Sequence, residues 1–293
     1  HVRSRRQRQM CIRDRYSPDG KEVAFLENRT AIRVINLKTK KVRTVMDAQY
    51  QYSYSDGDQW FEWSPDSKWI LSEFIGIGGW NNKDIVLLNA DGKGEMHNLT
   101  ESGYSDGNAK WVLGGKAMVW FSDRAGYRSH GSWGAQYDAY IMFFDVDAYD
   151  RFRMNKEDLA LLEEAEKAEK AEKEKAEKKK KEDKKGDKKK DAKGKKDGEE
   201  EKKEEVKPLK FDLDNRFDRI VRLTVNSSFM GDAVLTPKGD KLYYLAAFES
   251  GYDLWEHDLK ENSTKILLKG VGGGSLLPDK KGENIFMLSL IHI

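Results

Sequence analysis

A short turn sequence recurs along this chain, and it constrains the fold more than any other feature. Residues 16–21 read Tyr-Ser-Pro-Asp-Gly-Lys, and residues 63–68 read Trp-Ser-Pro-Asp-Ser-Lys. Proline presets φ at about −65° in the second turn position, while Asp, Gly and Ser tolerate the conformations that reverse the chain. Each copy is followed by a short apolar run, so the repeated unit reads as strand, turn and strand.

Weaker copies of the turn occur at residues 114–115, 238–239 and 281–282. The first three turns start 47 and then 48 residues apart, and removal of a charged insertion restores a similar spacing for the next interval. A period of about 40 to 50 residues with four short strands per unit is typical of a β-propeller. The sequence therefore predicts an all-β chain of four-stranded antiparallel blades, incomplete, with about four to five blades visible.

Each unit is expected to contribute its strands in the order of the chain. The predicted strands are 22–26, 31–37 and 41–45, then 59–63, 69–74, 84–89 and 96–100, then 109–112, 117–121, 137–144 and 218–224, then 232–235, 241–245, 252–256 and 264–268. A fifth unit begins at residue 274, and the first strand of the first unit is expected to be missing. The long gap in the third unit places the insertion between its third and fourth strands.

The insertion is nearly pure charge. Residues 156–207 hold 20 Lys and 19 Asp or Glu, which is 39 of the 104 charged residues in the chain. Residues 163–180 are predicted to form a solvated helix with Glu-to-Lys pairs four residues apart, such as Glu163 with Lys167. Residues 181–207 have too little apolar surface to fold. Because the two signs balance, we interpret the insertion as a spacer and not as a tether for membranes or RNA.

Composition shifts predict five segments. They are a non-native leader at 1–15, propeller blades at 16–150, the charged helical or disordered insertion at 151–210, further blades at 211–288 and a non-native tail at 289–293. The leader has six Arg, one Asp and no apolar periodicity, and both ends look like translated adaptor sequence. No secretory signal is visible in it.

Charge and composition exclude several function classes. Without residues 1–15 the formal charge of +2 becomes −3, so the chain lacks the basic face of a nucleic-acid binder. Cys11 is the only cysteine, which excludes a disulfide framework. No apolar run approaches the roughly 18 residues of a membrane span.

No catalytic or metal centre is expected. Asp123, Ser129 and His130 carry the residue types of a hydrolase triad, but adjacent Ser and His project differently and no Gly-x-Ser-x-Gly elbow surrounds the serine. His97 and His257 have no histidine partner at helical spacing. We therefore expect no catalytic residues, no metal and no cofactor.

Recognition is expected on the loops opposite the Ser-Pro-Asp-Gly turns. In a blade, the loops between second and third strands and the loops between blades share one end. Here they are rich in aromatic residues and glycine, and loops on a rigid scaffold are where binding usually occurs. The expected peptide-binding or gating residues are Trp80, Tyr127, Arg128, His130 and Trp133. The alternative is that these aromatic side chains only close over the blade edges.

Three motifs carry a family resemblance. Residues 121–134 read FSDRAGYRSHGSWG. The two phenylalanines at 143–144 are followed by AYDRF at 148–152, and FDLD at 211–214 is followed by DRIVRLT at 218–224. The turns alone resemble TolB-like repeats. Together the motifs resemble a propeller region of bacterial tricorn-like serine peptidases, over essentially residues 16–288.

The resemblance implies a function that this chain does not perform alone. Propellers of this family guide or gate peptides or unfolded proteins towards PDZ and serine-peptidase domains, which are the implied partners and are missing here. The chain itself is thus expected to be inactive. The resemblance suggests the periplasm, with the cytoplasm as alternative, and allows a homo-oligomer. A TolB-like protein docking module and the propeller of a prolyl-oligopeptidase-type dipeptidyl peptidase are alternative interpretations.

Overall fold

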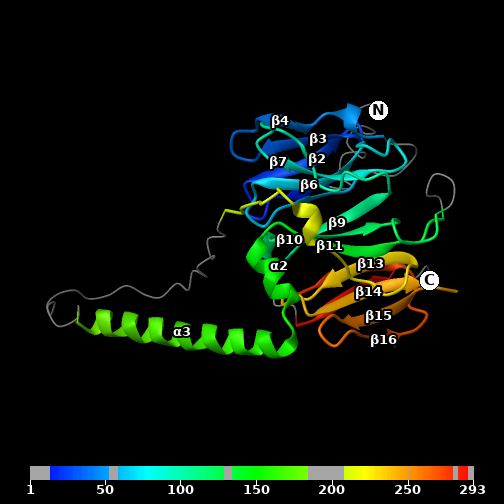
Figure 1. The fold of residues 1–293 in the computed structure, drawn as a ribbon. Helices are drawn as coiled ribbons and strands as arrows, with labels where there is room; N and C mark the ends of the chain where they lie inside the picture. Colours follow the sequence, from blue (N-terminus) through cyan, green and yellow to red (C-terminus); the bar gives the residue numbers. More distant parts are fainter. Residues whose placement is uncertain are drawn as a thin grey trace. The chain divides into compact units, whose positions relative to one another are not determined.

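The computed structural model describes residues 14–52, 59–128, 134–183, 208–249, 251–279 and 283–289. The chain divides into two units, one formed by residues 1–149 with 207–293 and the other by residues 150–206. Within the described residues of the first unit, four four-stranded antiparallel sheets follow one another along the chain, with a two-stranded sheet at the end (Figure 1). Each sheet is one blade.

In the first two blades, consecutive strands lie side by side. Blade 1 contains β1 (Arg15–Tyr16), β2 (Glu22–Glu27), β3 (Ala31–Asn36) and β4 (Val42–Met46), and blade 2 contains β5 (Phe61–Trp63), β6 (Trp69–Phe74), β7 (Asp84–Asn89) and β8 (His97–Asn98). A 3₁₀ turn at Ala48–Tyr50 precedes blade 2.

The other two blades repeat the same order. Blade 3 contains β9 (Asp106–Val112), β10 (Ala117–Ser122), β11 (Asp138–Phe143) and β12 (Ile220–Arg222), and blade 4 contains β13 (Phe229–Leu235), β14 (Lys241–Ala247), β15 (Asp253–Asp258) and β16 (Ser263–Leu268). β17 (Gly274–Pro278) pairs with β18 (Ile285–Ser289). Short 3₁₀ turns lie at Leu113–Gly115 and Arg216–Arg219.

The predicted fold class is confirmed, with one correction. The strands form four-stranded antiparallel blades of a β-propeller, and β11 pairs with β12 across the insertion. The first strand of blade 1 is not missing: Arg15 pairs with Ala24 and Tyr16 pairs with Val23. A strand of two residues has no alternation to detect, which is why the sequence pattern did not show it.

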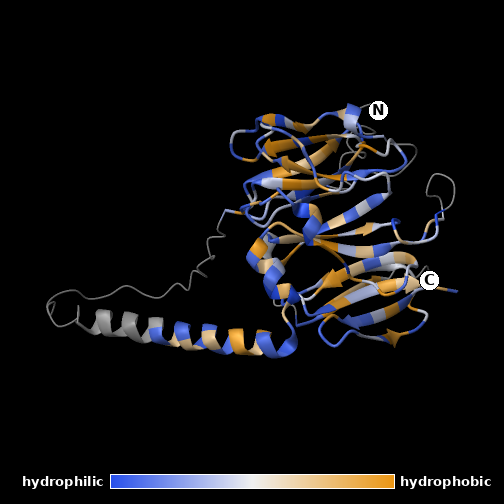
Figure 2. Ribbon diagram, viewed as in Figure 1, coloured by the Kyte–Doolittle hydropathy of each residue, from blue (hydrophilic) through white to orange (hydrophobic). Residues whose placement is uncertain are grey.

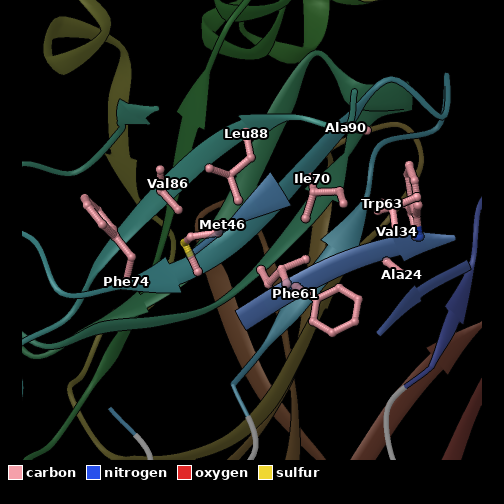
Figure 3. Close-up of a cluster of buried hydrophobic side chains, with 11 residues drawn as sticks. Ala24, Val34, Met46, Phe61, Trp63, Ile70, Phe74, Val86, Leu88 and Ala90 are labelled. Atoms are coloured by element: carbon pink, nitrogen blue, oxygen red, sulfur yellow. The ribbon is translucent and has the colours of Figure 1, made fainter. Parts of the chain in front are cut away.

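The core lies between successive blades. Phe61, Trp63, Ile70 and other side chains of blade 2 meet those of blade 1, including Ile32 and Met46, in one buried cluster (Figure 3). Apolar residues follow the strands throughout the sheets (Figure 2). Since both faces of a blade are covered by its neighbours, its central strands do not alternate between apolar and polar residues.

Blade 3 shows this two-sided burial most clearly. Every residue of β10 and β11 is buried. Met118, Trp120 and Met142 belong to the cluster shared with blade 2. Because side chains alternate along a strand, Val119 and Ile141 point to the other face of the sheet, and they are buried as well.

The Ser-Pro-Asp turns are built by one hydrogen-bond pattern. The Ser64 hydroxyl donates to Asp66 Oδ1 (2.6 Å) and accepts from the backbone N–H of Trp69 (2.9 Å). Ser17 and Asp19 repeat this arrangement at 2.7 Å in blade 1. Gly20 and Ser67 occupy the left-handed region at φ 72° and 61°, which the turn requires. The turn therefore fixes the register between the first and second strands of blades 1 and 2.

The chain returns from the insertion into the core of blades 2 and 3. The backbone N–H of Leu209 donates to Asp66 Oδ2 (2.8 Å), so a Ser-Pro-Asp turn anchors the returning segment. The Phe211 ring then packs edge-on against Trp69 (5.0 Å between centroids) and Phe144 (5.3 Å). The segment that follows the charged insertion is thus part of the folded sheets.

The second unit contains the helix predicted in the insertion. α2 (Val146–Arg153) leads into α3 (Lys156–Asp183), which is longer at both ends than the predicted 163–180. Asn155 caps α3, because its side-chain oxygen accepts from the backbone N–H of Asp158 (2.8 Å). Arg151 forms an ion pair with Glu166 (2.6 Å).

We expect the insertion and the returning segment to differ sharply in their effect on stability. Deletion of residues 163–205 should leave the melting temperature within about 2 °C, because a segment so rich in charge offers little apolar surface for packing. Phe211→Ala should lower the free energy of unfolding by about 2 to 4 kcal/mol through the loss of partly buried aromatic packing. Thermal and urea unfolding of both variants measure this. A deletion that melts as early as the Phe211 variant would contradict the assignment.

A line of charged contacts connects the first strands of successive blades. Glu62 of β5 accepts from the backbone N–H of Trp111 in β9 (3.1 Å). Lys110, also in β9, pairs with Asp232 of β13, and Asp232 Oδ2 accepts from the backbone N–H of Leu276 in β17 (2.8 Å). Burial raises the pKa of Glu62 above its ordinary value of 4.5, and the Trp111 N–H and Lys110 only partly oppose this.

We predict that Glu62→Gln stabilises the protein at pH 7.5. Because burial raises the pKa of Glu62 in the folded state, ionising this carboxyl lowers the free energy of unfolding at pH 7.5. This loss of stability disappears as the pH falls through the folded-state pKa. Glutamine keeps an oxygen acceptor for Trp111 and carries no charge. The gain in melting temperature should therefore shrink on acidification and vanish below about pH 4.5, where the carboxyl is neutral in both states. The exposed Glu95→Gln is the control, and an equal gain there would contradict the explanation.

Candidate functional site

The candidate site lies at the blade end opposite the Ser-Pro-Asp turns, which we call the loop end. It comprises the described parts of the loops between second and third strands, such as 75–83, 123–128 and 134–137, and of the loops between blades, such as 99–105. The strand order brings all of them to the same end of the sheets. Buried polar and charged residues hold these loops in place.

A buried aspartate at the start of the third strand holds two loops at once in blade 2. Asp84 is fully buried. Its carboxylate accepts from the backbone N–H groups of Ile77 (2.9 Å) and Ser102 (2.9 Å) and from the side chains of Asn98 (2.9 Å) and Thr100 (3.2 Å). These donors belong to the loop after β6 and the segment around β8, so one carboxylate ties both together. A buried carboxylate is tolerated because its oxygens are satisfied.

An aspartate stands at the same position in blades 3 and 4, where its partners lie on the fourth strand and the residues that follow it. The fully buried Asp138 accepts from Thr224 (2.7 Å) and Ser227 (2.7 Å) and pairs with Arg222 (2.7 Å). In blade 4, Asp253 accepts from the backbone N–H of Gly270 (2.8 Å). The position is therefore a repeated structural device.

Two further buried carboxylates hold the arginines of the loop after β10. Asp123 is fully buried and pairs with Arg128 (3.0 Å), and Asp106 pairs with Arg124 (3.2 Å). Both guanidinium groups also lie over the ring of Tyr104, at 5.8 Å for Arg124 and 4.9 Å for Arg128. The positive charges are thus neutralised and used to clamp an aromatic side chain.

Arg128 connects the loops of two blades. Its Nη2 donates to the side-chain oxygen of Asn82 (3.4 Å) and to the carbonyl of Gly103 (3.4 Å). Asn82 lies two residues after Trp80 in the loop of blade 2. Arg128 therefore holds the loop of Trp80 beside its own loop.

The loop end exposes aromatic surface. Trp80 is 49% exposed, Tyr127 67% and Tyr104 37%. The ring of Tyr52, which is also exposed, lies 5.5 Å from that of Trp80. The loops that carry Trp80, Tyr104 and Tyr127 are held by the buried carboxylates Asp84, Asp106 and Asp123. The arrangement offers contact surface at low conformational cost, which suits binding.

The structure places three of the five predicted site residues. Trp80 and Tyr127 are exposed on the loops of blades 2 and 3, and Arg128 lies between these loops in its contacts with Asp123 and Asn82. His130 and Trp133 lie outside the described residues. Tyr52 and Arg124 belong to the same surface and lie in loops, 50–58 and 124–134, that the sequence also assigns to this end of the blades. Tyr104 belongs to it as well and was missed by the sequence reasoning. Tyr104 stands in a Gly-Tyr-Ser run that resembles the loops that were identified, so a signal was present.

Within the described residues, no group of three or more His, Cys, Asp or Glu side chains is arranged to hold a metal ion. Among the helices of the described segments, none is both long enough and apolar enough to cross a membrane.

Comparisons with known proteins support the fold. No family model matches this sequence, and no curated protein matches it either. Among solved structures, the tricorn protease is similar with a TM-score of 0.54 at 10% identity, over 94% of this chain and 24% of that chain. TolB from Acinetobacter baumannii aligns with a TM-score of 0.49 at 16% identity, over 94% of this chain and 47% of that chain. The chain thus spans about a quarter of the tricorn protease and about half of TolB. The likeness to the tricorn protease fits a β-propeller.

Two glycines of the site provide a matched test of the loop geometry. A Cβ on Gly126 would lie 2.0 Å from the backbone carbonyl oxygen of Gln136, whereas a Cβ on Gly103 would meet nothing within 4 Å. We expect Gly126→Ala to destabilise the protein by about 1 to 3 kcal/mol, because backbone must move. Gly103→Ala should be neutral or stabilising by up to about 1 kcal/mol. Urea unfolding measures both, and equal effects would show that the loop after β10 is not packed as described.

Proposed function

We propose that this chain is a propeller region of a tricorn-like serine peptidase and that its loop end guides or gates peptide substrates. In this proposal the PDZ and peptidase domains belong to the parent protein outside this chain, and the parent works in the periplasm. The propeller fold and the sequence resemblance around residues 121–134 support the family. A fold alone does not define a function, so the proposal depends on the site.

The observation that carries the proposal is the exposed aromatic surface on clamped loops. Trp80, Tyr104 and Tyr127 offer ring faces that accept apolar side chains and peptide groups of many sequences. Arg124 and Arg128, which support these rings, are paired with the buried carboxylates Asp106 and Asp123. We infer that the aromatic side chains contribute contact surface and not proton transfer. Broad contact without chemistry is what a guiding surface for unfolded polypeptides needs.

Binding of an unfolded polypeptide tests this proposal. The probe is a fluorescein-labelled, carboxymethylated polypeptide that cannot fold, and anisotropy measures its affinity. Trp80→Ala and Tyr127→Ala should each weaken binding by roughly 5- to 30-fold, the effect of losing one aromatic anchor. Phe217→Ala is the matched control, because Phe217 is 45% exposed and lies before β12, at the opposite end of the blade.

The same experiment separates guidance from catalysis. The chain should bind the probe and leave it intact during prolonged incubation, and Ser129→Ala should change neither result. Affinity lost equally in the Phe217 variant, or cleavage abolished by Ser129→Ala, would contradict the proposal. Absence of binding to any unfolded probe would do so as well.

A further inference from the structure

A cavity lies at the loop end of blade 4, separate from the sequence motifs and from the aromatic surface of blades 2 and 3. Its volume is about 610 Å³. It is lined by the loop between β14 and β15, by the loop between blades 3 and 4, and by the residues that follow β16. The lining side chains that bear on ligand binding are Phe248, Glu249, Asp253, Trp255 and Lys269. This volume accommodates a side chain together with the backbone that carries it.

Aromatic rings form one wall of this cavity. The Phe248 and Trp255 rings meet edge to face, with centroids 5.3 Å apart and an interplanar angle of 73°. Trp255 in turn stacks on Tyr244 at 6.3 Å and 15°. Phe248 is 40% exposed, so part of its ring is open to an incoming group. The stacking fixes the wall before any ligand arrives.

Carboxylates flank the aromatic wall. Glu249 directly follows Phe248, and its side chain makes no hydrogen bond or ion pair with the described residues. Asp253 uses one oxygen, Oδ1, for the backbone N–H of Gly270. Lys269 also lines the cavity and is exposed, so two carboxylates oppose one ammonium and leave one net negative charge.

Aromatic faces beside carboxylates are the chemistry that recognises an organic cation. A guanidinium group fits best, because its plane stacks on a ring while its edge donates to a carboxylate. We propose that this cavity binds an arginine side chain of a peptide, and thereby selects basic peptides. This deepens the proposed function and rests on it, since it names a preferred class of substrate.

The test uses small probes that do not require the aromatic surface of blades 2 and 3. The probes are N-acetyl-arginine methylamide and its uncharged isostere, N-acetyl-citrulline methylamide. The indole N–H of Trp255 is buried and has no acceptor among the described residues, so its NMR signal is a local reporter. Trp255→Phe assigns that signal in protein labelled with ¹⁵N-tryptophan.

The arginine probe should shift the Trp255 signal saturably, and the citrulline probe should bind at least about fivefold more weakly. Glu249→Gln should weaken arginine binding about threefold or more, while Glu283→Gln should not change it. Glu283 is exposed and lies between β17 and β18, at the opposite blade end. Thermal unfolding checks that both variants are folded.

Three results would overturn the inference: no shift of the Trp255 signal, equal shifts with both probes, or equal losses in the two glutamate variants. The last would indicate general attraction by negative charge. Trp80→Ala should leave this titration unchanged. If the unaltered chain binds no unfolded polypeptide but still binds the arginine probe, the result counts against the proposed function alone.

Discussion

The fully buried carboxylate at the start of the third strand is the interaction on which the loop end depends. Removing a carboxylate from water costs several kcal/mol unless hydrogen bonds replace the lost hydration. In blade 2, Asp84 receives that replacement from two backbone N–H groups and two polar side chains on two different loops. The energetic need of one charge thus fixes both loops. In blade 3, Asp138 holds one segment in this way, through Arg222, Thr224 and Ser227.

This constraint separates the two ends of the blades by role. At the turn end, Ser and Asp side chains close tight turns and anchor the segment that returns from the charged insertion. At the loop end, buried carboxylates and the arginines paired with them present aromatic side chains, with Arg128 joining the loops of two blades. Aromatic side chains bind with the smallest entropic loss when their backbone is already ordered. The scaffold therefore supports recognition at one end and tolerates a long insertion at the other.

Local signals predicted most of the strands. Trp69–Phe74 and Asp84–Asn89 have the predicted bounds, because a turn or loop and a continuous apolar run define each of them. Contacts between distant segments could not be predicted in this way. Phe211 follows a charged stretch of the sequence that gives no sign of a folded segment, yet its ring packs between two blades. The bond between Arg128 and Asn82 joins residues 46 positions apart. Asp84, Asp138 and Asp253 did leave a signal, because an aspartate begins the third strand of blades 2, 3 and 4. The structural role of these residues follows only from their hydrogen-bond donors, which the sequence pattern does not show.

Hydrogen exchange at two backbone amides tests the central claim most directly. If the Asp84 carboxylate holds both loops, the amide protons of Ile77 and Ser102 are protected although they lie outside the strands. By NMR, both should exchange at least about 100-fold more slowly than in an unstructured peptide, and Asp84→Ala should remove this protection while the amides of β10 stay protected. Exchange at the unstructured rate in the unaltered protein would contradict the account, because the loops would then not be ordered by the buried carboxylate.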